Sequence, residues 1–112
     1  MILLRKPISR KRLREMAKVG FGNLVKAVVD IKQGIMVVDA SLHADEEALL
    51  LESGSSQADL WGINLYPDLT GKDMIEFDSM INLRPSQGNL TRSVDDPRFR
   101  EHIRKIVSVL VT

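Results

Sequence analysis

Apolar residues occur along the chain in two patterns, one with the two-residue period of a strand and one with helical spacing. The apolar run from Ile2 to Leu4 predicts a first strand, which Pro7 ends. Ser9 then provides an N-cap for a helix that Gly20 or Gly22 can end. The apolar positions of this helix are Leu13, Met16, Ala17 and Phe21.

Residues 25–39 predict a β-hairpin. Two β-branched stretches, 25–30 and 35–39, flank a turn at 32–34 that ends in glycine. Val28 lies on the opposite face of the first strand, between Lys26 and Asp30. The residues predicted to share the buried face are Val25, Ala27, Val29 and Ile31.

Residues 42–54 fit two structures. Asp45 can serve as an N-cap, which places Glu46 and Glu47 in a first helical turn, where acidic residues are favourable. Gly54 can end such a helix. Three consecutive leucines do not fix the period, so a strand over 48–52 is the alternative. We expect the short helix.

Residues 60–66 and 74–84 predict a second hairpin around the loop 67–73. Pairing of residues 66 and 74 places Asn64 opposite Glu76. In the same register Gly62 is opposite Asp78. This register gathers the apolar side chains on one face, which supports it. They are Trp61, Ile63, Leu65, Ile75, Phe77, Ile81 and Leu83.

A final helix begins after Asp96, with Pro97 at its first position. Its apolar stripe consists of Phe99, Ile103, Ile106, Val107 and Leu110. The order of elements is therefore β-α-β-β-α-β-β-α. We predict one α+β domain over residues 1–112, with a mixed or antiparallel sheet and helices packed on one face.

Composition narrows the possible classes of protein. The chain has no cysteine, which excludes disulfide frameworks, zinc ribbons and thiol catalysis, and suits a reducing compartment. No apolar run approaches the roughly 20 residues that span a bilayer. We expect a cytoplasmic protein with no membrane partner.

The net charge of +1 conceals an asymmetric distribution. Residues 1–26 carry +7, residues 39–78 carry −9 and residues 79–112 carry +3. These segments can neutralise each other across the surface, or leave a basic face for an anionic partner. Arg10, Lys11, Arg12 and Arg14 form the densest basic cluster. Because no aromatic residues alternate with them, the sequence does not favour a nucleic-acid partner.

The most distinctive polar segment follows the last predicted strand. Arg84 offers a planar fork that matches a carboxylate or phosphate. Asn82, Gln87 and Asn89 could orient a small anionic ligand around it, together with Arg92. The alternative is that Arg84 pairs with Glu76 or Asp78 and that the amides satisfy a long turn. The segment matches neither a Walker loop nor a dinucleotide-binding fingerprint.

His43 and Asp45 form a second candidate constellation. With Asp78 and the polar loop they could support general acid–base catalysis in a small hydrolase. A histidine just before a helix is more often a cap or a surface residue. Metal binding would need further ligands from distant segments. We therefore predict neither a metal site nor a cofactor.

Three stretches, 42–47, 59–67 and 76–89, resemble a family of short bacterial proteins catalogued as a domain of unknown function. The stretch from Asn82 to Asn89 is the most specific part of the resemblance. The resemblance implies a bacterial cytoplasmic protein that is complete at this length. It supplies no activity, cofactor or catalytic residue.

Three functions remain open on the sequence alone. The first is binding of a small anionic ligand through the polar loop 82–92. The second is a homo-oligomer, most simply a dimer, because small chains often complete their core by association. The third is the small hydrolase that uses His43 and Asp45 with the same loop.

Overall fold

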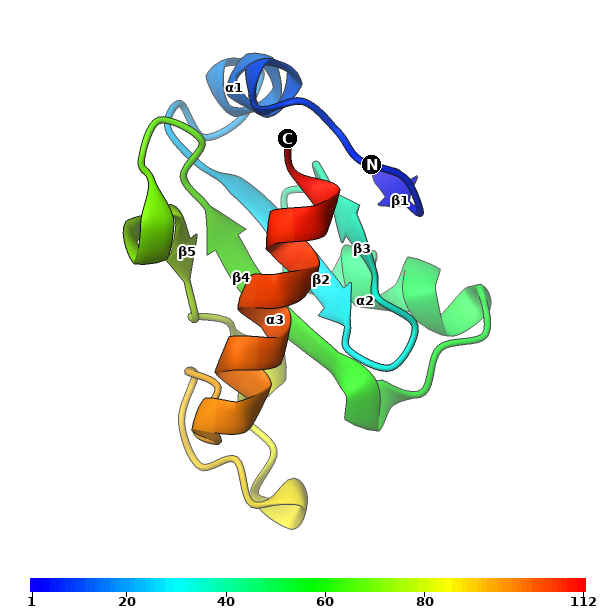
Figure 1. The fold of residues 1–112 in the computed structure, drawn as a ribbon. Helices are drawn as coiled ribbons and strands as arrows, with labels where there is room; N and C mark the ends of the chain where they lie inside the picture. Colours follow the sequence, from blue (N-terminus) through cyan, green and yellow to red (C-terminus); the bar gives the residue numbers. More distant parts are fainter.

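The computed structural model describes residues 1–112 and contains one antiparallel sheet of five strands in the order β1-β3-β2-β4-β5 (Figure 1). The strands are β1 (Ile2–Leu4), β2 (Val25–Asp30), β3 (Ile35–Val38), β4 (Leu60–Leu65) and β5 (Ile75–Glu76). The helices are α1 (Arg10–Val19), α2 (His43–Glu52) and α3 (Pro97–Leu110). Single-turn 3₁₀ helices lie at Gln57–Asp59, Gly71–Met74, Met80–Asn82 and Pro85–Gln87.

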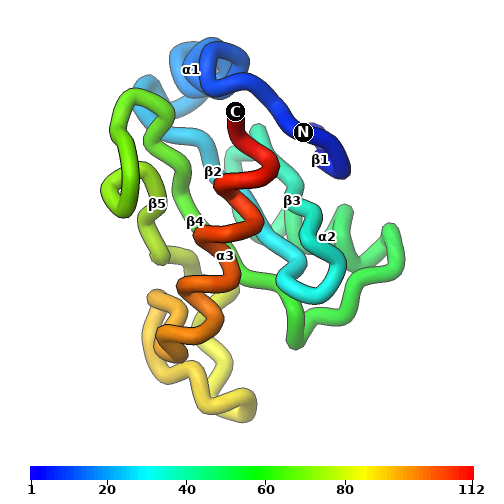
Figure 2. The backbone as a smooth tube through the Cα atoms, viewed as in Figure 1, coloured from blue at the N-terminus to red at the C-terminus, as the bar shows by residue number.

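Helices cover both faces of this sheet. Side chains of α1 and α3 pack with Ala27 and Val29 of β2 in the main core. Val28 points to the opposite face, where it joins a smaller apolar cluster with Leu50 of α2. Figures 1 and 2 show α3 in front of the sheet and α2 behind it. The predicted α+β domain and its order of elements are confirmed, but α2 lies on the face opposite α1 and α3.

Local signals in the sequence set the ends of most elements. The Ser9 side chain accepts a hydrogen bond from the Arg12 amide and caps α1, as predicted. Asp96 caps α3 in the same way, with Pro97 in its first turn. The first hairpin is also confirmed, and its turn places Gly34 at φ +68°, a conformation that favours glycine.

The segment 42–54 forms the expected helix, and the strand alternative is wrong. The helix begins earlier than predicted: its N-cap residue is Leu42 and not Asp45. His43 is therefore the first residue of α2, and its ring is buried instead of lying on the surface. The contact of 2.7 Å between His43 Nε2 and the Ile63 carbonyl ties the start of the helix to β4.

The second hairpin is shorter than predicted. Asn64 pairs with Glu76 and Leu65 with Ile75, in the predicted register. The strand then ends, so that Gly62 does not face Asp78. The chain turns across the sheet face that carries α2. As a consequence, Ile81 packs against the smaller cluster and Leu83 is exposed, and neither residue joins the main core.

Part of the basic N-terminal segment packs against the loop after β4. Arg10 donates from Nη1 to the carbonyl of Leu69 at 2.9 Å, and Arg14 pairs with Asp68 at 3.0 Å. Both partners of the ion pair are well exposed, so the pair adds little stability. No helix of this chain has the length and apolar character needed to cross a bilayer.

Candidate functional site

The Asn82 side chain completes the edge of β4 where β5 has ended. The amide of Gly62 donates to Asn82 Oδ1 at 2.8 Å, and Asn82 Nδ2 donates to the carbonyl of Gly62 at 2.9 Å. A neighbouring strand residue would satisfy the same two groups. Asn82 is fully buried, so its carboxamide acts as a substitute for one residue of the missing strand.

The guanidinium of Arg84 satisfies backbone carbonyls next to this position. Its Nε donates to Ile81 at 2.9 Å, its Nη1 donates to Gln57 at 2.8 Å, and its Nη2 donates to Leu60 of β4. The guanidinium carbon also lies 4.4 Å from the ring centroid of Trp61. Arg84 is thus held between the sheet edge and an aromatic ring.

The remaining amides hold the loop itself together. Asn89 Nδ2 donates to the carbonyls of Asn82 and Ser93, each at 2.7 Å, and its Oδ1 accepts from the Asp95 amide at 2.8 Å. Gln87 Nε2 donates to the carbonyl of Ala58 at 2.8 Å. The proposed ligand-binding amides therefore satisfy a long turn.

The structure separates the predicted ligand residues into two groups. Asn82, Arg84, Gln87 and Asn89 bind the chain's own backbone. Arg84 pairs with neither acidic residue considered for it, because Asp78 pairs with Arg92 at 2.7 Å instead. Arg92 is the one predicted ligand residue that faces an open groove.

Close packing over Gly62 gives a first testable prediction. A Cβ at this position would lie 2.5 Å from the Cβ of Ser79 and 2.6 Å from its Oγ. We expect Gly62→Ala to lower the free energy of unfolding by about 2 kcal/mol, since overpacking a core costs roughly that much. Urea denaturation measures the change.

The Ser79→Gly background is the matched test of this packing. It removes both atoms nearest the new methyl group, so Gly62→Ala should cost clearly less in that background. Equal costs in the two backgrounds would show that Ser79 is not the obstacle.

The open groove lies between the N-terminus of α2 and the segment 79–81. It has a volume of about 190 Å³. Its polar side chains come from Lys26 of β2, His43 of α2, Ser79 and Arg92. Leu42, Ala44, Met80 and Ile81 complete the lining.

His43 lines this groove, and one of its ring nitrogens has a hydrogen-bond partner within the chain. The residue is 7% exposed, and its Nε2 lies 2.7 Å from the carbonyl oxygen of Ile63. A carbonyl only accepts, so Nε2 carries the proton and Nδ1 has no partner within the chain. Burial lowers the pKa of His43, and the positive charges of Lys26 and Arg92 lower it further. The imidazole is therefore neutral at pH 7.

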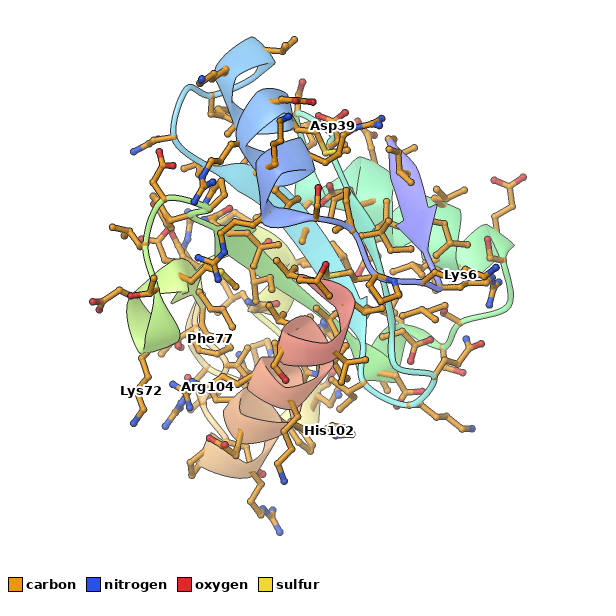
Figure 3. The ribbon with its side chains drawn as sticks, turned by 45° about the horizontal axis from the view of Figure 1, so that its top comes forward. Lys6, Asp39, Lys72, Phe77, His102 and Arg104 are labelled. Carbon is orange, nitrogen blue, oxygen red and sulfur yellow. The ribbon has the colours of Figure 1, made fainter.

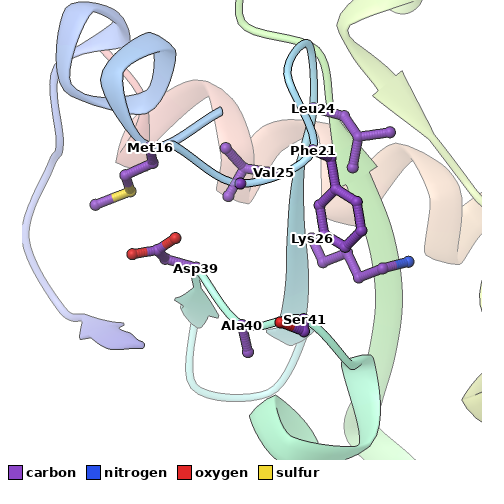
Figure 4. Close-up of a pocket in the computed structure, with 9 residues that line it drawn as sticks. Met16, Phe21, Leu24, Val25, Lys26, Asp39, Ala40 and Ser41 are labelled. Atoms are coloured by element: carbon purple, nitrogen blue, oxygen red, sulfur yellow. The ribbon is translucent and has the colours of Figure 1, made fainter. Parts of the chain in front are cut away.

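Positive charge converges on the groove from three elements. Lys26 also lines the adjacent pocket drawn in Figure 4, where its Nζ lies 5.2 Å from the centroid of the Phe21 ring. Arg92 uses its Nε to bind Asp78. The N-terminus of α2 adds the positive end of a helix dipole, and Leu42 supplies no side-chain cap for its free amides. An anion in the groove would meet all three.

The hydrolytic constellation is brought together only in part. His43 lines the groove. Asp78 does not line it, but it forms an ion pair with Arg92, which does. Asp45 is exposed and does not line the groove. The structure holds no group of three acidic or histidine side chains that could bind a metal ion.

Sequence reasoning missed Lys26 and Ser79 as groove residues. The signal for Lys26 was present, because it is the one basic residue of β2, which is otherwise apolar up to Asp30. What the sequence did not show is that α2 covers that face and brings His43 next to it. Ser79 was missed because the strand was expected to continue through it.

The fold and this groove define a small α+β domain with a cationic pocket at a helix N-terminus. Residues 2–110 match the family described as a protein of unknown function (DUF5674), and the chain belongs to that family. No curated protein and no solved structure matches the chain.

Proposed function

We propose that this protein binds a small anion in the groove lined by Lys26, His43 and Arg92. The observation that carries the proposal is that Lys26, Arg92 and the start of α2, which has no side-chain cap, line a single groove with His43. Cations and free helix amides that line one groove favour a bound anion.

The size and chemistry of the groove limit the ligand. A volume of about 190 Å³ suits a phosphate or sulfate group, or a short carboxylate. Such an anion can accept hydrogen bonds from Arg92, from Lys26 and from the free amides at the start of α2. We expect it to displace Asp78 from part of the Arg92 guanidinium.

His43 gives binding a dependence on pH. Its pKa is lowered in the free protein because burial and two cations oppose the imidazolium. A bound anion neutralises those cations and can accept a hydrogen bond from Nδ1 once His43 is protonated, so binding and protonation favour each other. Affinity for sulfate should therefore rise as the pH falls from 8 towards 5.5.

Isothermal titration with sulfate tests this dependence, because sulfate keeps its charge over that pH range. The affinity of the wild type for sulfate should rise as the pH falls, whereas the affinity of His43→Gln should change little with pH. A pH dependence that persists in His43→Gln would assign it to another group.

A thermal-shift series tests the location of the site. Sulfate should raise the midpoint of wild-type unfolding, since a ligand of the native state stabilises it by mass action. Lys26→Met and Arg92→Ala should lose this shift, whereas Lys18→Met, which removes an exposed cation of α1, should keep it. Arg84→Ala should lower the midpoint of unfolding in the absence of sulfate, and sulfate should still raise it. If only Arg84→Ala lost the shift caused by sulfate, the anion would bind at the polar loop 82–92 and not in the groove.

A small hydrolase is a second candidate function. The neutral Nδ1 of His43 at an anion-binding groove could accept a proton from water that attacks a bound ester. Asp45 takes no part in this arrangement. Hydrolysis of p-nitrophenyl phosphate that is lost in His43→Gln would support it, and no turnover by the wild type would leave a binding protein.

A homodimer is the alternative that needs no ligand. Met80, Leu83 and Leu90 are exposed on or beside the polar segment, at 62%, 43% and 67%. These side chains could be covered by a second copy. Sedimentation equilibrium decides between a monomer and a dimer.

We place the protein in a bacterial cytoplasm, which the absence of cysteine supports.

A further inference from the structure

A second groove lies on the other side of the sheet, where α3, the start of α1 and the turn Gly71–Met74 meet. Its volume is about 400 Å³. Three cations, Arg10, Lys72 and Arg104, line it together with Ser108, and no acidic side chain does. The apolar part of the lining is formed by Met74, Ile75, Val107 and Val111.

Two of the three cations are only partly neutralised by the chain. Arg104 has a long contact of 3.3 Å between Nη1 and Glu101, and its Nε is buried without a hydrogen-bond partner. Lys72 has no ion-pair partner. Figure 3 shows Lys72 and Arg104 next to each other, beside Phe77. The Arg104 guanidinium carbon lies 5.3 Å from the centroid of that ring, which holds it in place.

Arg10 supplies the third charge from a fixed position. Its Nη1 donates to the carbonyl of Leu69 at 2.9 Å, which ties the side chain to the loop after β4. The other guanidinium nitrogens have no partner within the chain. The groove thus combines preorganised donors with an apolar floor.

We infer that this groove binds an organic phosphate monoester, with the phosphate on the three cations and the organic group on the apolar floor. Three cations suit a dianion better than a single carboxylate. The volume falls in the range of small-molecule pockets, which are mostly apolar with a few placed polar groups. The site shares no residue with the groove at His43, so it goes beyond the proposed function.

The test compares hexyl phosphate, hexanol and inorganic phosphate by isothermal titration. Hexyl phosphate should bind more tightly than either of its parts, because only it uses both the cations and the apolar floor. Lys72→Met should weaken hexyl phosphate about tenfold, the effect of losing one charge-assisted contact. Lys72 is exposed, so this variant should fold normally. Arg104→Met should weaken binding at least as much.

Two control variants show whether the loss of affinity belongs to this groove. Lys105→Met removes an exposed cation of α3 outside the groove and should leave the affinity unchanged. Lys26→Met should also leave it unchanged, so failure of the His43 groove does not affect this result. Equal losses in Lys72→Met and Lys105→Met would overturn the inference, as would equal binding of inorganic and hexyl phosphate.

A further arm distinguishes a free monoester from a lipid headgroup. Phosphatidylcholine vesicles containing phosphatidic acid present the same phosphate chemistry on a surface. We expect soluble hexyl phosphate to bind and the vesicles to bind no more than vesicles of phosphatidylcholine alone. Binding to the anionic vesicles without binding to hexyl phosphate would overturn the small-molecule site.

Discussion

Replacing Asn82 with alanine will lower the free energy of unfolding by about 3 kcal/mol. The carboxamide satisfies both the amide and the carbonyl of Gly62 on β4, and it also donates to the carbonyl of Arg92 at 3.0 Å. Removing it leaves the amide and the carbonyl of Gly62 unsatisfied in a fully buried place, at roughly 1–3 kcal/mol each, whereas the Arg92 carbonyl keeps its bond from the Ser79 amide. Partial access of water to the new cavity offsets part of the sum.

Urea denaturation of three variants tests this role. Asn23→Ala, at an exposed position, should change stability by less than about 0.5 kcal/mol. Asn82→Asp keeps the acceptor for the Gly62 amide but loses both donated bonds, and it buries a carboxylate, so it should be no more stable than Asn82→Ala. A loss below about 1 kcal/mol in Asn82→Ala would show that water replaces the carboxamide and that the sheet edge does not depend on it.

Replacing Glu46 with glutamine will stabilise the protein at neutral pH. The Glu46 side chain is completely buried on α2, where Oε2 accepts from the Ala40 amide at 3.2 Å and Oε1 has no partner. Burial raises the pKa of this carboxyl from 4.5 to about 9. The folded protein therefore holds a proton that the unfolded chain releases.

The sign of the pH dependence follows from this raised pKa. The contribution of Glu46 to stability is complete below pH 4.5, and it is lost as the pH rises towards 9. Each pH unit in that window costs about 1.4 kcal/mol, so Glu46→Gln should gain about 4 kcal/mol at about pH 7.5 relative to its effect at low pH.

Unfolding free energies of the wild type and Glu46→Gln across this pH range measure the effect. Glu52→Gln changes an exposed carboxylate at the end of the same helix and provides the control, with a nearly constant difference from the wild type. A constant difference for Glu46→Gln as well would mean that Glu46 is ionised in the folded protein.

The sequence predicted those elements whose boundaries are set by local interactions. Ser9 and Asp96 are N-caps that act within three residues of themselves, and the glycine of the first hairpin acts within its own turn. The register of Asn64 with Glu76 was also predictable, because polarity alternates in step on both strands.

The end of β5 could not be predicted in this way. The alternation of apolar and polar residues continues to Arg84, although the strand ends at Glu76. Asn82 and Arg84 replace strand pairing with side-chain hydrogen bonds to Gly62 and Leu60. Such side-chain hydrogen bonds leave no repeating pattern in the sequence. The polar residues that complete the edge of the sheet therefore resemble those of a ligand-binding loop.

The candidate site was predicted only through His43 and Arg92. Both were identified by their chemistry, but what unites them is the placement of α2 on the second face of the sheet. Lys26 follows from the same placement, because it points to that face from β2. A helix's choice of face depends on packing between distant segments, which a single sequence does not display.

A titration of ¹⁵N-labelled protein with sulfate tests the anion-binding groove most directly. The proposal predicts progressive shifts of the backbone amides of His43 and Ala44 at the start of α2, with the same shifts absent in Arg92→Ala. Shifts that are absent in the wild type, or that gather at Arg84 and Gln87 instead, would contradict it.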